Sequence, residues 1–591
     1  MVGLAVAGQS LPNFERALYR GQPIIETAST AGDVVPRALA DAGLPASVPV
    51  ARIEITGSLS NVVRRARSSL EDGSHAAVLV SGDSAVVVAF GGPGLARQAY
   101  AELSPNSESD TSIPSLIKAV LAVYHGYFPG PPQPRPWFVR RGGRRTAQVD
   151  GVSVIQSEAA RPAPVYLPVD PVRILLARGS DAMEIVGRLA ELSSSVESGR
   201  KLVEVSGEGP LCAAVIGRNP DELRRELGLM EKGVPEAFSS GTDWVTPLGS
   251  SFSPQPVGPA AEIAFVYPGV YSAYPGMARD VFRVFPEAHH FLASLTEDPG
   301  ASFAADLVFP RTDRPLERAL LAEYDLRLRS DLPALMSAGA ACAAIYTHIL
   351  REVAGLRPVA GLGFSLGEIS MLWAMRVWQD SDHSRARSAE SNLFTTRLVG
   401  SGQAVRSYRA AAGLFDAGPM WASYGLLTSP EEVERALSSF EMVFLTMVNS
   451  PREVVIGGDP AQCAALAQQL GCDAIPLPFE HALHCPVALG ELPELTRLNT
   501  NPTSALQDVR LYSADEYAPL KLETEELAQA IARMSSRRLD FPRLVNRVYD
   551  DGARIFIEAG PSAASSRLID AILAGRPHLA VAVDLSWLVD A

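Results

Sequence analysis

The sequence predicts an α/β fold, in which helices cover both faces of parallel sheets. In the second half of the chain, strand-like and helix-like segments alternate, and a Gly-x-Ser-x-Gly motif joins one such strand to the next helix. Of the 591 residues, 47% are hydrophobic and 20% are charged, which is typical of globular domains. Because a single core stops growing near about 300 residues, several domains are expected.

A new α/β domain is predicted to begin near residue 259. The stretch 249–259 is rich in Ser, Gly and Pro, which indicates a linker. The apolar run 262–267 follows it and ends in Pro-Gly, as a buried parallel strand does. Helical patterning then predicts helices over 277–285 and 332–353, and a strand is expected over 359–364.

A small subdomain is predicted within this domain, at about 420–480. Its segments alternate in the order β-α-β-β-α-β, which favours a ferredoxin-like insertion. The chain then returns to the larger fold with a strand over 554–558, followed by a Gly-Pro turn and a helix.

The segment Gly363-Phe364-Ser365-Leu366-Gly367 has the pattern of a nucleophile elbow. Glycines two residues before and after the serine allow a strand to turn sharply into a helix. This turn lifts the serine hydroxyl clear of the backbone and directs the helix N-terminus toward the reacting oxygen. The pentapeptide alone is weak evidence, but the strand before it and the helix after it fit, so we expect an enzyme that transfers acyl groups.

Composition excludes several other classes of protein. The formal net charge of −14 argues against nucleic acid as a partner, because phosphate binding needs clustered Lys and Arg. No uninterrupted apolar run reaches the roughly 18–20 residues of a membrane span. The five cysteines are scattered and odd in number, which suggests neither disulfides nor a metal site and favours the cytoplasm.

A serine nucleophile needs a general base, and the chain has nine histidines. His484 lies just beyond the predicted insertion, in the segment 478–486. Taken by itself it has the features of an ordinary loop or core histidine.

Five blocks, in order, resemble the acyltransferase domain of fatty acid and polyketide synthases, which would occupy residues 259–591 with an α/β-hydrolase-like fold. The blocks are Phe265–Gly269 with Tyr274–Met277, Gly363–Glu368, Asn449–Arg452 with Val454–Gly458, His481–Pro486, and Phe541-Pro542 with Ile557–Pro561.

This resemblance implies a Ser–His dyad, with Ser365 as the nucleophile and His484 as its general base. In that family a backbone carbonyl, rather than a carboxylate, holds the imidazole. The backbone N–H groups of Val270 and Leu366 would form the oxyanion hole. Ser365 would attack a thioester, and a second thiol would then take the acyl group.

The resemblance also bears on the substrate. Members that load malonyl groups carry an arginine after the elbow, which binds the free carboxylate, and Arg397 matches it. It lies further from the serine than usual, and the polar stretch 380–387 can absorb the extra length. His481 begins a His-Ala-Leu-His variant that accompanies malonyl substrates, so malonyl is the expected group.

Three departures from the family make the expected pocket more apolar and aromatic. The turn after Pro-Gly, at 270–274, lacks two glutamines, Phe364 replaces the usual histidine before the nucleophile, and Leu332 replaces another glutamine. These changes would suit a longer acyl chain.

Residues 1–165 resemble a shortened, thiolase-like ketosynthase. Gly57 stands where the cysteine nucleophile should be, and His125 matches only a helix-end position. We therefore expect this domain to be inactive and to serve docking or dimerisation. Residues 166–258 resemble the small α/β domain that links ketosynthase and acyltransferase. The whole arrangement is similar to PfaB-type subunits of bacterial polyunsaturated fatty acid synthases.

Three functions follow as alternatives. The first is transfer of an acyl group between acyl-CoA and the phosphopantetheine arm of acyl carrier domains in a larger synthase subunit, with no bound cofactor. The second is thioesterase-like release of long-chain acyl groups, since the dyad does not separate transfer from hydrolysis. The third is a non-catalytic scaffold, against which the presence of both Ser365 and His484 argues.

Overall fold

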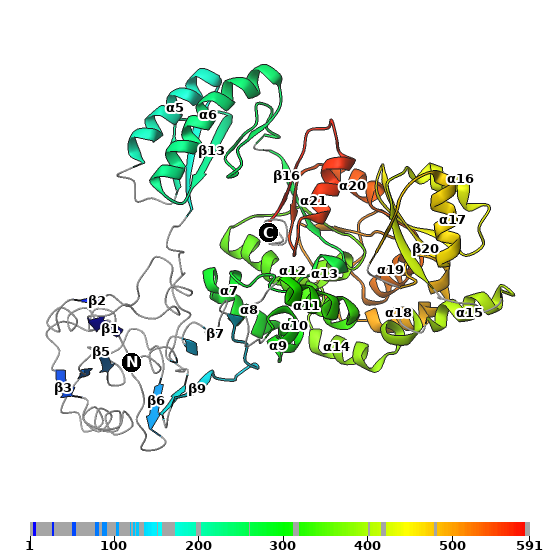
Figure 1. Cartoon of the computed structure of the whole chain (residues 1–591), viewed down its shortest axis with the longest axis horizontal. Helices are drawn as coiled ribbons and strands as arrows, with labels where there is room; N and C mark the ends of the chain where they lie inside the picture. The colour runs from blue at the N-terminus through cyan, green and yellow to red at the C-terminus, as the bar shows by residue number, and fades with distance from the viewer. Residues whose placement is uncertain are drawn as a thin grey trace. The chain divides into compact units, whose positions relative to one another are not determined.

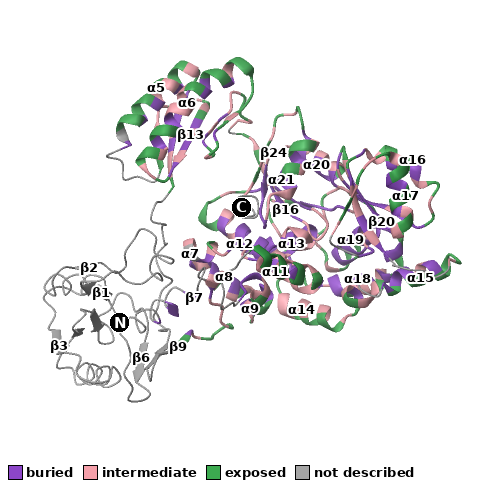
Figure 2. Ribbon diagram, viewed as in Figure 1, coloured by how far each residue is buried: buried purple, intermediate pink, exposed green. Residues whose placement is uncertain are grey.

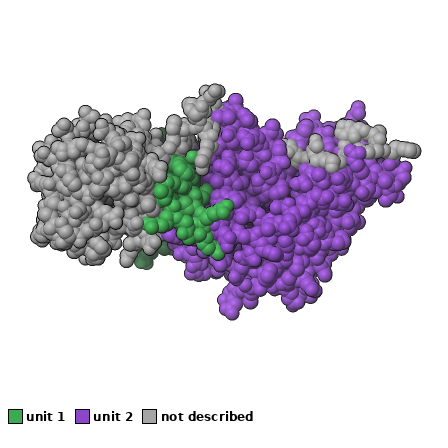
Figure 3. Space-filling view, turned by 90° about the horizontal axis from the view of Figure 1, so that it is seen from below, with its two compact units in different colours: residues 1–256, 280–287 green, residues 257–279, 288–591 purple. Residues whose placement is uncertain are grey.

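The computed structural model of the chain describes residues 172–196, 203–258, 260–310, 318–399, 402–414, 421–477 and 481–584, and shorter segments before residue 172. The chain forms two compact units, one of residues 1–256 and 280–287 and the other of residues 257–279 and 288–591 (Figure 3). The division after Pro256 falls within the predicted linker.

Before residue 172, the described part of the first unit consists mainly of short strands in three sheets, of order β2-β1-β5-β4-β3, β6-β10-β9 and β7-β8. They are β1 (Leu4–Ala7), β2 (Thr27–Ala28), β3 (Val50–Glu54), β4 (Ala77–Ser81), β5 (Val86–Gly91), β6 (Glu102–Pro105), β7 (Tyr127–Phe128), β8 (Arg135–Pro136), β9 (Thr146–Val149) and β10 (Val152–Ile155). Gly57 and His125 lie outside the described residues, so the ketosynthase-like domain stays a prediction.

The rest of the first unit includes a five-stranded sheet of order β12-β11-β13-β15-β14 with two helices. Its elements are β11 (Arg173–Gly179), α5 (Ala182–Ser195), β12 (Val203–Ser206), β13 (Leu211–Gly217), α6 (Pro220–Ser240), β14 (Trp244–Val245) and β15 (Ser251–Phe252). Asp181 and Asn219 cap the two helices by accepting backbone N–H bonds. Buried residues of α5, α6 and β13 form one core (Figure 2).

The second unit is built on a parallel sheet of order β22-β17-β16-β24-β25. The strands are β16 (Glu262–Tyr267), β17 (Ala360–Gly363), β22 (Arg510–Tyr512), β24 (Ala553–Glu558) and β25 (Leu579–Ala582). This confirms the predicted α/β class. Tyr267 pairs with Gly363, so β16 and β17 end level and the loops that follow them emerge side by side.

Helices α13, α20 and α21 contact this sheet, and α12 packs on α13 (Figure 1). Around them lie further helices. Apart from the two helices of the smaller sheet described below, the described helices of this unit are α8 (Glu287–Leu295), α9 (Pro299–Ser302), α10 (Ala305–Val308), α11 (Arg318–Ser330), α12 (Leu332–His348), α13 (Gly367–Ala374), α14 (Ser381–Glu390), α15 (Gln403–Ala411), α18 (Leu492–Asn499), α19 (Thr524–Ser536), α20 (Phe541–Asp550) and α21 (Ala564–Ile572).

Two predicted helices had different outcomes. The helix expected over 332–353 forms as α12, which a π-helical turn continues to Val353. Among the described residues, this segment alone is long and apolar enough to cross a membrane, and 56% of its most apolar window is buried. The helix expected over 277–285 was wrong in extent, since only α7 (Val281–Val284) forms. Ala278 has a φ of 55°, in the left-handed region, which a helix cannot accommodate.

Residues 421–476 form a smaller sheet with two helices. The elements are β18 (Ala422–Leu426), α16 (Pro430–Leu437), β19 (Val443–Ser450), β20 (Glu453–Gly458), α17 (Pro460–Leu470) and β21 (Ala474–Pro476). They follow one another in the order that the sequence predicts, and the strands lie in the order β21-β18-β20-β19-β23, where β23 is Leu539–Asp540. A capping box of Ser429 and Glu432 begins α16. The assignment as ferredoxin-like stays a prediction.

Candidate active site

Ser365 lies at the turn between β17 and α13, with a φ of 56°. A backbone in this left-handed region costs of order 1–3 kcal/mol for a residue other than glycine. The flanking glycines make the turn possible. A Cβ atom at Gly363 would lie 2.1 Å from the backbone nitrogen of Glu368, and one at Gly367 would lie 1.9 Å from the carbonyl oxygen of Tyr267. Any larger residue at either position would push the elbow away from the sheet.

His484 stands directly against the serine. Its Nε2 is 2.7 Å from the Oγ of Ser365. The other ring nitrogen, Nδ1, donates to the carbonyl oxygen of Met534 at 2.9 Å, and the backbone N–H of His484 donates to Ser535 at 2.7 Å. The Nδ1–H bond leaves Nε2 without a proton, so that it can accept one from the hydroxyl. With a φ of 58°, His484 also has a left-handed backbone.

Burial keeps the imidazole neutral. The side chain of His484 is buried, and this loss of solvation lowers its pKa from 6.5 to about 4, although backbone hydrogen bonds to Met534 and Arg537 work in the opposite direction. His481 is buried nearby, and its pKa is also lowered to about 4, first by burial and then by the charge that His484 would carry. At neutral pH, His484 therefore has the protonation state of a general base.

This environment predicts an unusual pH dependence. A general base fails when protonated, so kcat/KM for acylation is expected to stay level from pH 7 to about pH 5 and to fall only as the pH approaches the lowered pKa of His484, about 4. Stability should decrease in the same direction, since the unfolded chain binds protons more readily from about pH 6.5 downward. Initial rates, with circular dichroism at each pH as a control for folding, would measure this. An acid limb centred near pH 6.5 in folded protein would contradict it.

Two residues that line the cavity with Ser365 lie at the starts of helical turns, where their backbone N–H groups are available. Leu366 is the N-cap residue of α13, and Val270 is the first residue of a 3₁₀ turn, Val270–Ser272, that follows β16. The first N–H groups of a helix have no carbonyl partner within it. Both residues line the same cavity as Ser365 and His484. The structure thus brings together all four residues that the sequence predicts for the dyad and the oxyanion hole.

The cavity has a volume of about 390 Å³ and largely apolar walls. Phe364 lines it and packs edge-on against Phe541, with ring centroids 5.0 Å apart. His481 also lines it and stacks on Tyr271, at 5.6 Å between centroids. The small sheet contributes Asn449 and Glu453, whose side chains form a 2.8 Å hydrogen bond, and apolar residues. The apolar residues from this sheet and the segment after it include Met447, Val455 and Leu477.

Arg397, expected to bind a substrate carboxylate, lies elsewhere. Its guanidinium makes a two-bond ion pair with Glu491, one bond being 2.7 Å from Nε, and this pairing raises the pKa of Arg397. Glu491 is buried, so the ion pair holds the arginine firmly. Arg397 is not among the residues that line the cavity, and neither is any other Lys or Arg of the described chain. The expectation that Arg397 faces the substrate is therefore not met.

Three polar residues of the site were missed as functional candidates. Asn449 and Glu453 flank the tight turn between β19 and β20, and the Asn-Ser-Pro-Arg block was the available signal. Glu368 is fully buried in the first turn of α13, where it accepts the backbone N–H of Ala514 at 2.8 Å. This contact ties the elbow helix to the loop after β22, and burial raises the pKa of Glu368 to about 8.

No family model matches the sequence, but several known proteins are similar to it. The chain is 26% identical over 563 residues to a component of the polyunsaturated fatty acid synthase of Thraustochytrium sp., a match that covers 80% of this chain and 26% of that protein. It is 24% identical over 505 residues to "Polyketide synthase GfsA" of Streptomyces halstedii, covering 77% of this chain and 6% of that one. The chain thus spans about a quarter or less of the length of these relatives.

Two solved structures show the fold. The acyltransferase domain from module 8 of the salinomycin polyketide synthase matches with a TM-score of 0.53 and 17% identity, covering 70% of this chain and 91% of that one. The acyltransferase domain of SpnD, in complex with 2-(pent-4-yn-1-yl)malonyl, matches with a TM-score of 0.52, 17% identity and the same coverage. The chain therefore has the fold of synthase acyltransferase domains, and its resemblance to a component of a polyunsaturated fatty acid synthase is confirmed. That it is of the bacterial kind stays a prediction.

Proposed function

We propose that this chain is a serine acyltransferase, which carries an acyl group from one thiol to another through an ester on Ser365. The observation that carries the proposal is the 2.7 Å contact between the Oγ of Ser365 and the unprotonated Nε2 of His484, at the wall of an apolar cavity. A hydroxyl becomes a useful nucleophile when a base at this distance takes its proton.

The reaction proceeds in two half-reactions. In the first, His484 Nε2 takes the hydroxyl proton while Ser365 Oγ attacks the thioester carbon. The C–S bond then breaks, and the proton passes from His484 to the leaving thiol. In the second, a new thiol gives its proton to His484 and attacks the ester carbon. The bond from that carbon to Ser365 Oγ then breaks, and the proton passes from His484 to Oγ. The N–H groups of Val270 and Leu366 would stabilise both oxyanions, each by roughly 2.7–4 kcal/mol.

The two thiols are those of coenzyme A and of a phosphopantetheine arm on an acyl carrier domain. The names of the similar proteins support this, since one is a subunit of a polyunsaturated fatty acid synthase and the other is a polyketide synthase. Every step of the proposed mechanism uses protein groups alone, so it involves no cofactor. Dimerisation through the N-terminal half and a cytoplasmic location stay predictions.

The cavity favours an uncharged acyl group over malonyl. A malonyl carboxylate would lie in an apolar space that Glu453 lines and to which the described chain contributes no Lys or Arg. A carboxylate without a cationic partner is expensive to bury. The predicted malonyl preference came from Arg397 and from the His-Ala-Leu-His segment at His481. Of the two, Arg397 is paired with Glu491 and lies outside the lining, whereas His481 lines the cavity.

The apolar lining of the cavity predicts that an uncharged acyl-CoA donor is used in preference to malonyl-CoA. Butyryl-CoA, which is close to malonyl-CoA in size but has no free carboxylate, is expected to give at least about a tenfold higher kcat/KM, equivalent to about 1.4 kcal/mol. Transfer to pantetheine and release of free acid would be followed together, which separates transfer from hydrolysis. Arg397→Gln should change the ratio by less than about twofold. A preference for malonyl that Arg397→Gln abolishes would show that this arginine enters the cavity and would overturn the assignment.

A further inference from the structure

A second cavity, of about 370 Å³, lies beside the first. Met336, Leu366, Ile369 and Phe394 line both cavities and form the boundary between them. Leu366 directly follows the candidate nucleophile, so the second cavity begins next to the position that the acyl carbon would occupy. Ligand sites are concave and mostly apolar, and a pocket of this size beside the candidate nucleophile indicates a ligand subsite.

Small side chains keep this space open. Helix α12 presents small residues to the second cavity at helical spacing, over more than two turns, and two indole rings add apolar surface to its lining. The α12 residues are Ala334, Ser337, Ala340, Ala341 and Ala344, and the indoles are those of Trp373 and Trp378. The walls are mostly apolar, so the space suits a hydrocarbon chain better than a polar ligand.

Helix α14 closes another side of the cavity, which it lines through Ser384, Arg385, Ser388 and Ala389. This helix is formed by the polar stretch that lengthens the segment between Ser365 and Arg397. The same extra residues that displace the arginine along the sequence therefore build a wall of the second cavity.

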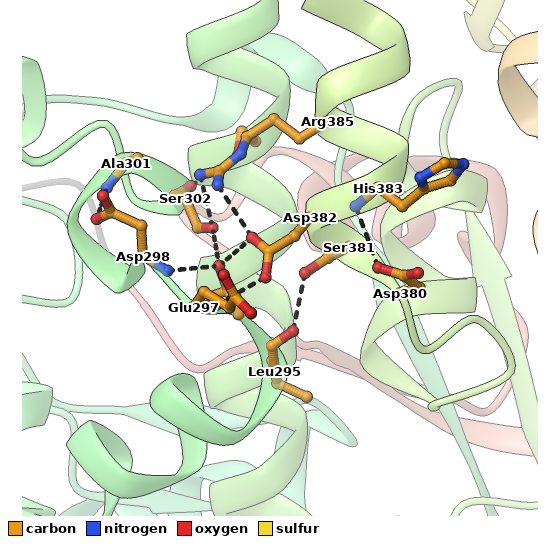
Figure 4. Close-up of polar contacts among 12 residues, drawn as sticks. Leu295, Glu297, Asp298, Ala301, Ser302, Asp380, Ser381, Asp382, His383 and Arg385 are labelled. Carbon is orange, nitrogen blue, oxygen red and sulfur yellow. Dashed lines mark hydrogen bonds and ion pairs between the residues drawn. The ribbon is translucent and has the colours of Figure 1, made fainter. Parts of the chain in front are cut away.

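Arg385, Ser302 and Thr296 line the second cavity and belong to one hydrogen-bonded network with Asp382 (Figure 4). Arg385 donates to Asp382 at 2.9 Å and to the hydroxyl of Ser302 at 3.1 Å. Asp382 also accepts from the hydroxyl of Thr296 and from the backbone N–H of Glu297, both at 2.6 Å. The charge of Arg385 is thus balanced within the wall, and a ligand that ends here needs no charge of its own.

We infer that the second cavity holds the distal part of a long, uncharged acyl chain whose carbonyl carbon is bound at Ser365. The inference rests on the proposed function and names its substrate class. The acyl chain would extend from the oxyanion hole past Leu366 and cross the boundary between Met336 and Phe394. Met336 has a flexible side chain, Phe394 has a planar one, and both positions are half-buried. It would then lie between α12 and α14, along the walls of the second cavity.

The test compares long and short acyl donors in the full-length chain. The readout is the ratio of kcat/KM for palmitoyl-CoA to that for butyryl-CoA, with pantetheine as acceptor. Ala340→Phe and Ser388→Phe each place a ring in the second cavity from a different helix and are expected to lower this ratio at least about tenfold. Ala386→Phe adds the same ring to α14 at a position outside the cavity lining, and it should leave the ratio within about twofold.

Two results would overturn the inference. One is an unchanged ratio in both folded cavity variants. The other is a wild-type enzyme that uses butyryl-CoA but not palmitoyl-CoA. Both would leave the proposed function intact, because the short donor still reacts. If no donor of any length acylates the wild-type chain, the proposed function fails together with the inference.

Discussion

Ser365→Ala and His484→Ala are each expected to lower the rate of acyl transfer by at least about a thousandfold, and the double variant should be no slower than either single one. The two side chains act as a unit, because the hydroxyl is a weak nucleophile without the base and the base has nothing to activate without the hydroxyl. Transfer from butyryl-CoA to pantetheine would measure all three variants. Ser407→Ala, at an exposed position on α15, is the control and should keep the wild-type rate.

Additive losses in the double variant would contradict this account. So would a His484→Ala enzyme that kept a tenth of the wild-type rate, because the 2.7 Å contact would then have no catalytic consequence.

Gly367→Ala is expected to lower the free energy of unfolding by about 3 kcal/mol or more, because overpacking against rigid backbone cannot be relieved by a rotamer change. The new Cβ would lie 1.9 Å from the carbonyl oxygen of Tyr267. Chemical denaturation followed by circular dichroism would measure the change. Protein that still folds should have lost activity, since Ser365 and the N–H of Leu366 would move with the elbow.

Gly339→Ala provides the matched control. Gly339 lies inside α12, and a Cβ atom there would meet nothing within 4 Å. Alanine has the higher helix propensity by up to about 1 kcal/mol, so this change should be neutral or stabilising. A Gly367→Ala variant as stable as Gly339→Ala would mean that the tight passage of the elbow against β16 does not exist.

The elbow could be predicted because its constraints are local. The glycines at 363 and 367 are needed by a turn of five residues, and in the structure a Cβ atom at either position would collide with backbone. His484 was harder, since its Met534 partner lies 50 residues further along the chain. Only the resemblance of the surrounding block singled it out among nine histidines.

The position of Arg397 could not be predicted, for the opposite reason. Its place in the motif was consistent with a carboxylate clamp, but its partner Glu491 lies 94 residues away and has no distinguishing pattern in the sequence. The polar stretch 380–387 was interpreted only as extra length before Arg397, whereas most of this stretch forms helix α14. Spacing along a chain does not show which way a side chain turns when a strong partner competes for it.

The second cavity was also hidden in the sequence. The alanines and serines of α12 have the pattern of an ordinary apolar helix, and the space appears only when several helices from different parts of the chain are brought together. The departures Phe364 and Leu332, by contrast, did signal an apolar site, and both residues line the first cavity. Replacement of polar residues is visible in one sequence, but the volume that neighbouring helices leave between them is not.

The central claim is that Ser365 carries the acyl group as an ester, and one measurement tests it directly. Wild-type protein would be incubated with palmitoyl-CoA or butyryl-CoA without an acceptor thiol, quenched in acid and digested, and the peptides would be analysed by tandem mass spectrometry. The account predicts an acyl mass on the peptide that contains Ser365, located on that serine and absent in Ser365→Ala. An acyl mass on another residue, such as a cysteine, or no adduct from either donor, would contradict it.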